Sequence, residues 1–381
     1  MIQLEILRYA AGGQCVARHE NRVVFIRGVL PGEIVNAEIT SEGKGGRFLI
    51  ADLISVITPS PLRIAPPCKY AGNCGGCDWQ HASIETQVQL HGEVIQDQLN
   101  RIGKFDQIKI EPVLSVPGET GLGYRSRVRY ATTNNGESAM RKHGSNELVP
   151  IDECLIAEPR LNEITTSNWR PSSEITLVAG SDEVLVLTDR EIVPQISYSN
   201  RHGQWVVPAG DFWQVHKDAP EVLIDSVLKF LDPMSGDQIG DLYSGVGLFA
   251  LPIARKIGRD GLVTAVELDH RANKAADQNL KDFDNVQTVE SDVAIFLKSR
   301  PVFNKVVLDP PRSGLNNSVI RSLNSIASLN QIVYVSCDSG TLARDLRSFA
   351  DLGWQIKVIQ PLLLFPMTAH IETVVHLSKV S

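Results

Sequence analysis

Between residues 206 and 381 the sequence alternates short apolar runs with helix-like stretches. The pattern predicts strands at 238–242, 262–266, 306–308 and 332–335, and a helix at 248–257. Short, continuously apolar runs are typical of strands that are covered on both faces. Alternating strands and helices build a mostly parallel sheet with helices on both sides. We therefore predict an α/β, Rossmann-like domain over residues 206–381.

A glycine-containing loop follows the first of these strands, with the sequence Asp-Leu-Tyr-Ser-Gly-Val-Gly at residues 241–247. Glycine allows close approach of a ligand, and open α/β sheets bind ligands beyond the carboxyl ends of their strands. Glu267 ends the next strand, where a carboxylate can accept hydrogen bonds from both ribose hydroxyls of an adenosine. The loop also fits the fingerprint of NAD-dependent dehydrogenases, so it predicts an adenosine-containing ligand without choosing an enzyme class.

Three residues with reactive side chains lie at other predicted strand ends of this domain. Asp309 and Cys337 each follow a buried strand, and Glu372 precedes a last strand at 373–377. Aspartate beside prolines is also ordinary turn chemistry, and a lone cysteine is more often a small core residue. Their position at the mouth of a cofactor-binding sheet makes Cys337 a candidate nucleophile and Glu372 a candidate general base.

The remainder of the chain divides near a group of prolines between residues 59 and 67. Residues 1–58 show short strands and glycine turns, a pattern typical of a small OB-like β-barrel, with or without an oligonucleotide ligand. A middle segment, 59–205, contains an amphipathic helix predicted over 82–102. We expect domain boundaries close to residues 58 and 205.

Four of the six cysteines lie in the middle segment, in the pattern C-x5-C-x2-C followed by a distant fourth; they are Cys68, Cys74, Cys77 and Cys154. Clustered cysteines in a long, cysteine-poor chain indicate metal ligands more often than disulfides. Zinc ligands usually come as two close pairs, whereas three close cysteines and a remote one resemble ferredoxin ligation. The spacing leaves zinc and an iron–sulfur cluster open. Cys15 fits no motif and is expected to be structural.

The formal net charge is −7 and the sequence pI is about 5.8. General nucleic-acid binders are usually basic, so contact with a nucleic acid would need a local basic surface. Such a surface is predicted on a strand at 124–130, where three arginines alternate, and on the basic residues 141–143. A solvated basic strand is the simpler alternative. No apolar run approaches the ~18 residues of a membrane span, and the N-terminus lacks a signal-peptide pattern, so we expect a cytoplasmic location.

Taken together, these motifs resemble RNA 5-methyluridine methyltransferases that carry a TRAM domain and an iron–sulfur cluster. The resemblance covers essentially the whole chain. Its motifs are Leu30-Pro-Gly-Glu33, the cysteine pattern, Phe212-Trp-Gln-Val215, residues 241–247, Asp309-Pro-Pro-Arg312, Val335-Ser-Cys337 with residues 341–345, and His370-x-Glu372-Thr373. One residue departs from the family pattern: Ser339 replaces the proline that usually stands two residues after the nucleophile.

The resemblance implies a role for each candidate residue. Gln214, Tyr243, Glu267 and Asp309 would contact S-adenosylmethionine, and Cys68, Cys74, Cys77 and Cys154 would hold a 4Fe-4S cluster. Cys337 would add to C6 of a uracil, which makes the otherwise poorly nucleophilic C5 able to take a methyl group. Glu372 would then remove the C5 proton so that the cysteine can leave.

Three functions compete on this evidence. RNA uridine methylation uses all the motifs, whereas an NAD-dependent oxidoreductase leaves Cys337, Glu372 and the cysteine pattern without a shared purpose. A non-catalytic RNA-binding iron–sulfur protein would need no cofactor loop. The TRAM-like segment favours 23S ribosomal RNA over transfer RNA as the substrate, and we expect a monomer without membrane contact.

Overall fold

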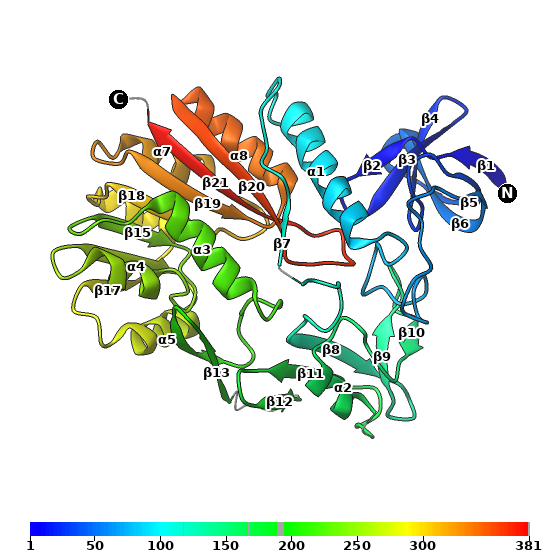
Figure 1. The fold of residues 1–381 in the computed structure, drawn as a ribbon, viewed down its shortest axis with the longest axis horizontal. Coiled ribbons are helices and arrows are strands. Elements are labelled where there is room, and N and C mark those ends of the chain that lie inside the picture. The colour runs from blue at the N-terminus through cyan, green and yellow to red at the C-terminus, as the bar shows by residue number, and fades with distance from the viewer. Residues whose placement is uncertain (117, 167, 189–193, 380–381) are drawn as a thin grey trace.

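The computed structural model describes residues 1–116, 118–166, 168–188 and 194–379 (Figure 1). A curled β-sheet formed by the N-terminal residues lies at one end of the molecule and a large mixed sheet with its helices lies at the other. No helix among the described residues is long and apolar enough to span a bilayer.

The large sheet has eight strands in the order β17-β16-β15-β18-β19-β21-β20-β7. Their bounds are β15 (Gln238–Leu242), β16 (Leu262–Glu267), β17 (Val286–Glu290), β18 (Lys305–Leu308), β19 (Gln331–Ser336), β20 (Trp354–Leu363), β21 (Glu372–Lys379) and β7 (Leu114–Ser115). Strands β15 to β19 pair in parallel, and β21 lies antiparallel between β19 and β20. The predicted parallel sheet is therefore confirmed, and each predicted strand is found within a residue or two.

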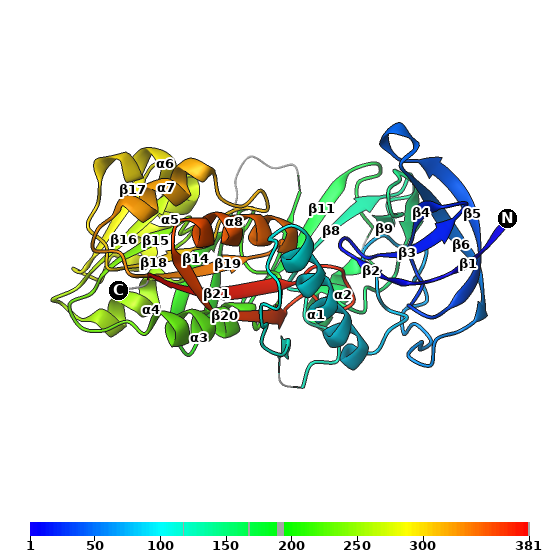
Figure 2. The same cartoon turned by 90° about the horizontal axis from the view of Figure 1, so that it is seen from above.

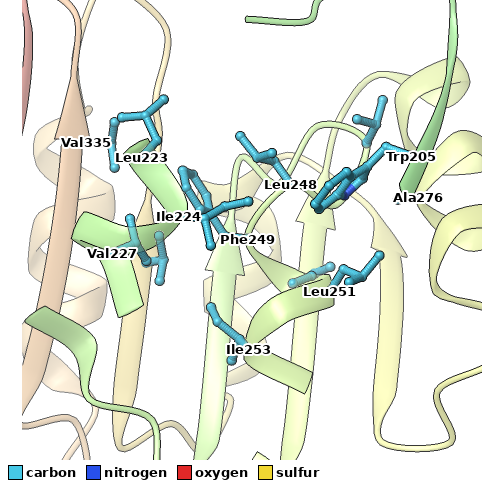
Figure 3. Close-up of a cluster of buried hydrophobic side chains, with 14 of the residues drawn as sticks. Trp205, Leu223, Ile224, Val227, Leu248, Phe249, Leu251, Ile253, Ala276 and Val335 are labelled. Carbon is cyan, nitrogen blue, oxygen red and sulfur yellow. The ribbon is translucent and has the colours of Figure 1, made fainter. Parts of the chain in front are cut away.

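Helices cover both faces of this sheet, as Figure 2 shows for α3 and α4 on one side and α6 to α8 on the other. Their bounds are α3 (Ala219–Leu231), α4 (Ala250–Ile257), α5 (His270–Leu280), α6 (Val293–Phe296), α7 (Asn317–Ser325) and α8 (Ser339–Asp351). Alternate strand residues enter the two cores: in β19, Val333 and Val335 pack with α3 to α5, and Ile332 and Tyr334 pack with α7 and α8. Figure 3 shows Val335 facing α3 in the first of these cores. The resulting two-sided burial explains why these strands are apolar throughout.

The N-terminal sheet has six strands in the order β1-β5-β6-β4-β3-β2. They are β1 (Ile2–Glu5), β2 (Arg8–Ala10), β3 (Gln14–His19), β4 (Arg22–Ile26), β5 (Ile34–Glu42) and β6 (Phe48–Thr58), with a 3-10 turn at Lys44–Gly46. The turn before β5 is fixed by Glu33, a fully buried carboxylate that accepts hydrogen bonds from the backbone of Leu30 and Ser60 and pairs with Arg63. This buried pair anchors the linker that leaves the sheet.

A second sheet, in the order β10-β9-β8-β11-β12, occupies the middle of the chain. Its elements are β8 (Arg127–Thr132), β9 (Ser138–Arg141), β10 (Leu148–Pro150), α2 (Pro159–Thr165), β11 (Glu174–Ala179) and β12 (Val184–Leu187), followed by the hairpin β13 (Gln195–Asn200) and β14 (Gly203–Pro208). The hairpin packs toward the large sheet, because Trp205 lies in the core that contains α4.

Helix α1 (Ile84–Arg101) confirms the predicted helix and begins at Ser83, whose side chain accepts a hydrogen bond from Thr86 N. It joins parts of the chain that are distant in sequence. Leu90 and Val94 pack in the core of the N-terminal sheet, whereas Ile95 and Leu99 pack with α7 and α8. Strand β7 likewise adds to the large sheet beside β20. Two elements of residues 59–205 are thus shared with neighbouring sheets.

Candidate active site

Four predicted residues follow parallel strands of the large sheet at the same edge. Tyr243, Glu267, Asp309 and Cys337 come at or directly after the carboxyl ends of β15, β16, β18 and β19. The chain leaves β15 for β16 on one side and reaches β18 on the other, so the order of the strands reverses at this point. Open α/β sheets bind ligands in the crevice at such a reversal. The topology therefore gathers these four residues where a ligand is expected.

Glu372 reaches the same edge from the opposite chain direction. It begins β21, and Ser336 in β19 pairs with Thr373 in β21, which places Cys337 across from Glu372. Glu372 is only 4% exposed, so it is not a solvated carboxylate at the end of a strand. The antiparallel insertion of β21 is therefore what brings the candidate base to the candidate nucleophile.

The glycine-containing loop is held in an unusual backbone conformation. Tyr243, Gly245 and Gly247 all have positive φ angles, of 65°, 53° and 85°. Glu267 stabilises the loop by accepting hydrogen bonds from the backbone nitrogens of Gly245 (2.9 Å) and Asp269 (2.8 Å). A carboxylate offers about four acceptor sites, so Glu267 keeps capacity for ribose hydroxyls.

The glycine-containing loop itself contains buried polar atoms without partners. Neither carboxyl oxygen of Asp241 has a hydrogen-bond partner, and the Ser244 hydroxyl also lacks one, among the residues that the structure describes. Open space lies where a Cβ of Gly245 would stand. Burial, together with the nearby carboxylates Asp309 and Glu267, raises the pKa of Asp241 to about 8, against a smaller lowering contribution from the backbone N–H of Ala250. A cationic ligand with hydrogen-bonding groups would satisfy these atoms, which fits S-adenosylmethionine.

Gln214 lies on the segment between β14 and α3 and is buried. The neighbouring Trp213 stacks on Tyr198 and shares a core with Val246 of the glycine-containing loop. Trp205 of the hairpin donates a hydrogen bond to the carbonyl of Gly247. The segment that carries Gln214 is therefore adjacent to the loop.

The charges around Cys337 oppose its ionisation. Burial raises the pKa of Cys337 to about 11, with further contributions from Glu372 and Asp309, while the positive charge of Arg312 acts in the other direction. Burial raises the pKa of both Glu372 and Asp309 as well, and Asp309 adds to the increase at Glu372. Burial thus makes the Glu372 carboxylate more basic than a solvent-exposed one, which favours proton transfer to it once it is ionised.

Residues of α8 fix the loop that carries Arg312. Asp345, which is fully buried, accepts hydrogen bonds from Leu315 N (2.7 Å) and the Tyr334 hydroxyl (2.8 Å), and Thr341 donates to the carbonyl of Arg312. The helix begins at Ser339, and Asp338 caps it by accepting from Thr341 N. Proline suits the first position of a helix, but the cap holds the turn with serine there.

The four cysteines of the middle segment line one cavity of about 120 Å³, together with Gln80, Arg125, Arg129, Glu153 and several apolar side chains. All are free thiols, and burial raises the pKa of Cys74, Cys77 and Cys154, with the neighbouring thiols adding to the increase. Within the described ranges, no group of three or more histidine, cysteine, aspartate and glutamate side chains is arranged to hold a metal ion. The fold thus assembles the predicted cysteines without showing a preformed single-ion site.

The basic strand differs from the prediction. Strand β8 begins at Arg127, and the guanidinium of Arg127 donates to the backbone carbonyls of Asp211 and Ala209. Arg129 pairs with Glu174 in the neighbouring strand. Arg125 lies before the strand and lines the cysteine cavity. The three arginines therefore do not form one free basic face, because backbone carbonyls bind Arg125 and Arg127 and the Glu174 carboxylate pairs with Arg129.

The sequence interpretation did not select Asp241 or Arg312 as site residues, although both lie in its motifs. Asp241 was detectable as a charged residue inside an otherwise apolar strand, a position that requires a specific partner. Arg312 gave no such signal, because its effect on Cys337 depends on how the loop after β18 folds back.

Comparison with known proteins identifies the family. A model of the tRNA (uracil-5-)-methyltransferase family matches residues 286–380, and a TRAM domain model matches residues 2–53. An uncharacterized RNA methyltransferase of Streptomyces coelicolor is 35% identical over 98% of this chain and 91% of its own length. A 23S rRNA (uracil(1939)-C(5))-methyltransferase RlmD of Acidithiobacillus ferrooxidans is 29% identical over 95% of this chain and 94% of its own length.

The fold has a solved counterpart. A crystal structure of the Pyrococcus abyssi tRNA (uracil-54, C5)-methyltransferase with S-adenosyl-L-homocysteine has a TM-score of 0.74 and 22% identity, covering 98% of this chain and all of the other. These matches set aside the oxidoreductase and the non-catalytic RNA-binding protein. The chain belongs to the S-adenosylmethionine-dependent RNA uracil-C5 methyltransferases that carry a TRAM domain.

Proposed function

We propose that Cys337 is the nucleophile and Glu372 the proton acceptor of this methyl transfer. The observation that carries the proposal is their juxtaposition across β19 and β21, at the sheet edge that also holds the glycine-containing loop. A lone half-buried cysteine and a lone buried carboxylate would each have simpler explanations. Their convergence beside a cofactor loop does not.

The chemistry follows from these two side chains. Cys337 loses its proton to water and adds as a thiolate to C6 of the uracil, which moves an electron pair into the C4 carbonyl and makes C5 nucleophilic. S-adenosylmethionine, when bound, supplies an electrophilic methyl group. C5 would take this methyl group as the bond from the methyl carbon to the sulfonium breaks, which leaves S-adenosyl-L-homocysteine. Glu372 then accepts the C5 proton, the electron pair of the C5–H bond re-forms the C5–C6 double bond, and the C6–S bond breaks to restore the Cys337 thiolate. Arg312 favours the first step, because its charge stabilises the thiolate.

Gln214, Tyr243, Glu267 and Asp309 are proposed to hold S-adenosylmethionine. The unpartnered carboxyl oxygens of Asp241 and the open space over Gly245 support a cationic ligand at this position. The buried Asp309 follows β18, which lies between β15 with the glycine-containing loop and β19 with Cys337. From this position it can contact both the cofactor and the uracil.

Replacing Glu372 with Gln tests the order of steps, because the amide keeps the shape of the side chain but cannot accept the proton. The variant is expected to transfer one methyl group and then remain covalently joined to RNA. A denaturing gel should show a slow band that requires S-adenosylmethionine and disappears with ribonuclease. Cys337→Ala on this background should abolish the band, whereas a band that persists would assign the nucleophile elsewhere. Normal turnover of Glu372→Gln would assign the base elsewhere.

We propose that Cys68, Cys74, Cys77 and Cys154 hold a 4Fe-4S cluster, and that the cluster, when bound, joins the loop of residues 68–77 to Cys154. The shared cavity supports this proposal. The thiolates around a cluster of several irons stand farther apart than those around one tetrahedral zinc ion. The absence of single-ion geometry in the described residues is therefore compatible with the larger group.

Anaerobically purified protein should be brown and contain iron and acid-labile sulfide. Cys154→Ser is expected to lower both the iron and the sulfide content. Cys15→Ser should leave them unchanged, because Cys15 is buried in the core of the N-terminal sheet and does not line the cysteine cavity. Stoichiometric zinc without sulfide would refute the cluster.

Ribosomal RNA is the proposed substrate, with transfer RNA as the second candidate. The TRAM match and the ribosomal activity named for the Acidithiobacillus relative support the first. The transfer RNA activity named for the Pyrococcus enzyme motivates the second. An open hollow lined by Gly75, Arg141, Lys142 and His143 lies beside the cysteine loop. Arg141 pairs with Glu174 and Lys142 with Glu147, so phosphates of either RNA would have to compete with these carboxylates for the two cations. Mapping 5-methyluridine in both RNAs from a deletion strain distinguishes them.

Three broader expectations remain predictions: domain boundaries near residues 58 and 205, a monomeric enzyme, and a cytoplasmic location. The boundary near 58 is consistent with the end of β6 and with the anchoring of the linker by Glu33 and Arg63.

A further inference from the structure

The loop that leads into Glu372 is held almost entirely by residues from outside its own domain. We call residues 366–370 the entry loop. Met367 in this loop is a non-glycine residue with a φ of 66°, a conformation that needs support from its surroundings. The entry loop ends two residues before β21, so its position bears directly on Glu372.

Two residues that directly follow Cys77 bind the entry loop from one side. The backbone nitrogens of Asp78 and Trp79 both donate to the carbonyl of Met367, over 2.8 and 3.0 Å. The Asp78 carboxylate accepts a hydrogen bond from Ala369 N at 3.0 Å. The end of the cysteine loop is therefore joined to the entry loop by three hydrogen bonds.

Two further side chains, those of Gln87 and Tyr124, form hydrogen bonds with the backbone of the entry loop. Gln87 of α1 is fully buried; its oxygen accepts from Met367 N at 2.7 Å and its amide donates to the carbonyl of Ala82. The Tyr124 hydroxyl donates to the carbonyl of Pro366 at 2.9 Å. Together with Asp78 and Trp79, these two side chains satisfy the backbone nitrogens of Met367 and Ala369 and the carbonyls of Pro366 and Met367.

Asp78 also connects the entry loop to the N-terminal sheet. Its second carboxyl oxygen pairs with Arg27, which follows β4, at 2.7 Å. Both side chains are partly exposed, so the ion pair by itself adds little stability. Asp78 nevertheless lies at the end of the cysteine loop, and its side chain contacts both Arg27 beside the N-terminal sheet and Ala369 of the entry loop.

We propose that Asp78 is a positioning residue for the second half of the reaction, and that it acts by holding the entry loop so that Glu372 faces C5 of the uracil. The inference rests on the proposed role of Glu372. It assigns a catalytic effect to a contact formed by the cysteine-containing and N-terminal parts of the chain, outside the methyltransferase sheet.

The physical basis is the different demand of the two half-reactions. Addition of Cys337 and transfer of the methyl group use residues after β15, β16, β18 and β19. In the described part of the chain, no hydrogen bond joins Tyr243, Glu267, Asp309 or Cys337 to the entry loop. Removal of the C5 proton needs Glu372 within hydrogen-bond reach of one hydrogen atom. A displacement of about 1 Å can reduce a rate by about a hundredfold. Loosening the entry loop should therefore slow proton removal selectively.

The experiment measures both half-reactions in the full-length protein with its RNA. Asp78→Ala removes the acceptor for Ala369 N, and a lost charged hydrogen bond predicts a ten- to hundredfold slower release of the covalent RNA adduct. Single-turnover methyl transfer should stay within about threefold of wild type. The slow band on a denaturing gel should therefore accumulate, as is expected for Glu372→Gln. Asp78→Asn keeps one acceptor oxygen and is expected to show a smaller delay, which provides a test if the alanine variant does not fold.

Asp152→Asn is the matched control, because Asp152 is also an ion-paired carboxylate on the cysteine side, but its partners are Lys69 and Tyr70. It should leave both rates unchanged. Arg27→Met removes the ion pair and leaves the Ala369 contact, so it should delay adduct release less than Asp78→Ala. Iron and sulfide contents should equal those of wild type in every variant.

Each contrary result overturns the inference. Equal slowing of methyl transfer and adduct release would mean that Asp78 only supports folding, and normal adduct release would mean that the contact does not matter. A fall in iron content would place the effect at Cys77 instead. Normal turnover of Glu372→Gln in parallel would remove the proposed base and this inference together, whereas a stalled Glu372→Gln beside a normal Asp78→Ala would refute this inference alone.

Discussion

Asp241→Asn is expected to stabilise the protein at neutral pH while weakening cofactor binding. The carboxyl of Asp241 is fully buried in β15, and neither oxygen has a hydrogen-bond partner among the described residues. The chain thus carries an unpaired acid at the centre of its sheet. Such a group is retained when a ligand satisfies it, at a cost to the ligand-free fold.

The size and sign of the effect follow from the pKa. Aspartate in an unfolded chain titrates near about 3.9, whereas the pKa of Asp241 in the folded protein is raised to about 8. Its contribution to stability is therefore fully present below pH ~4 and is lost as the pH rises toward 8, by about 1.4 kcal/mol per pH unit. At pH 7 the loss is about 4 kcal/mol. Asparagine does not ionise, but its buried amide costs about 1–3 kcal/mol, which leaves a gain of about 1–3 kcal/mol.

Thermal unfolding between pH 5 and pH 8 measures this gain. Asp241→Asn should raise Tm by about 2–4 °C for each kcal/mol at pH 7, with a smaller advantage at pH 5. Calorimetry should show at least tenfold weaker binding of S-adenosylmethionine, because the cation loses a carboxylate. Asp282→Asn, at an exposed position, is the control and should change neither. A stability difference that does not depend on pH would refute the assigned ionisation.

Two other substitutions test the same pocket. Arg312→Gln removes the charge that lowers the pKa of Cys337, so formation of the RNA adduct at pH 8 should slow about three- to tenfold and recover at higher pH. The control Arg321→Gln, on the exposed face of α7, should leave the rate of adduct formation unchanged. Glu267→Ala removes the acceptors for Gly245 N and the proposed ribose contact, so calorimetry should show ten- to more than hundredfold weaker binding of S-adenosylmethionine; Glu290→Ala, at the end of the adjacent strand, should bind normally.

Much of the fold and of the site was contained in local sequence patterns. The apolar runs around residues 240, 264 and 333 predicted the parallel strands because residues buried on both faces must be apolar. Residues 241–247 predicted a ligand-binding loop because only certain residues, glycine foremost, accept positive φ. The cysteine spacing predicted residues that the fold gathers around one cavity. Each signal lies within one element or one turn, where sequence and conformation are directly linked.

The tertiary structure alone decided how these pieces meet. Insertion of β21 between β19 and β20 places Glu372 beside Cys337, and strand order over such distances is set by packing that no local pattern records. The same holds for Arg127, which resembles an RNA-binding residue in sequence but donates to the carbonyls of Asp211 and Ala209 in the fold. Asp78 reaches the entry loop across 291 positions of sequence. A hydrogen bond at that separation depends on the final arrangement of three sheets, so it became visible only with the folded chain.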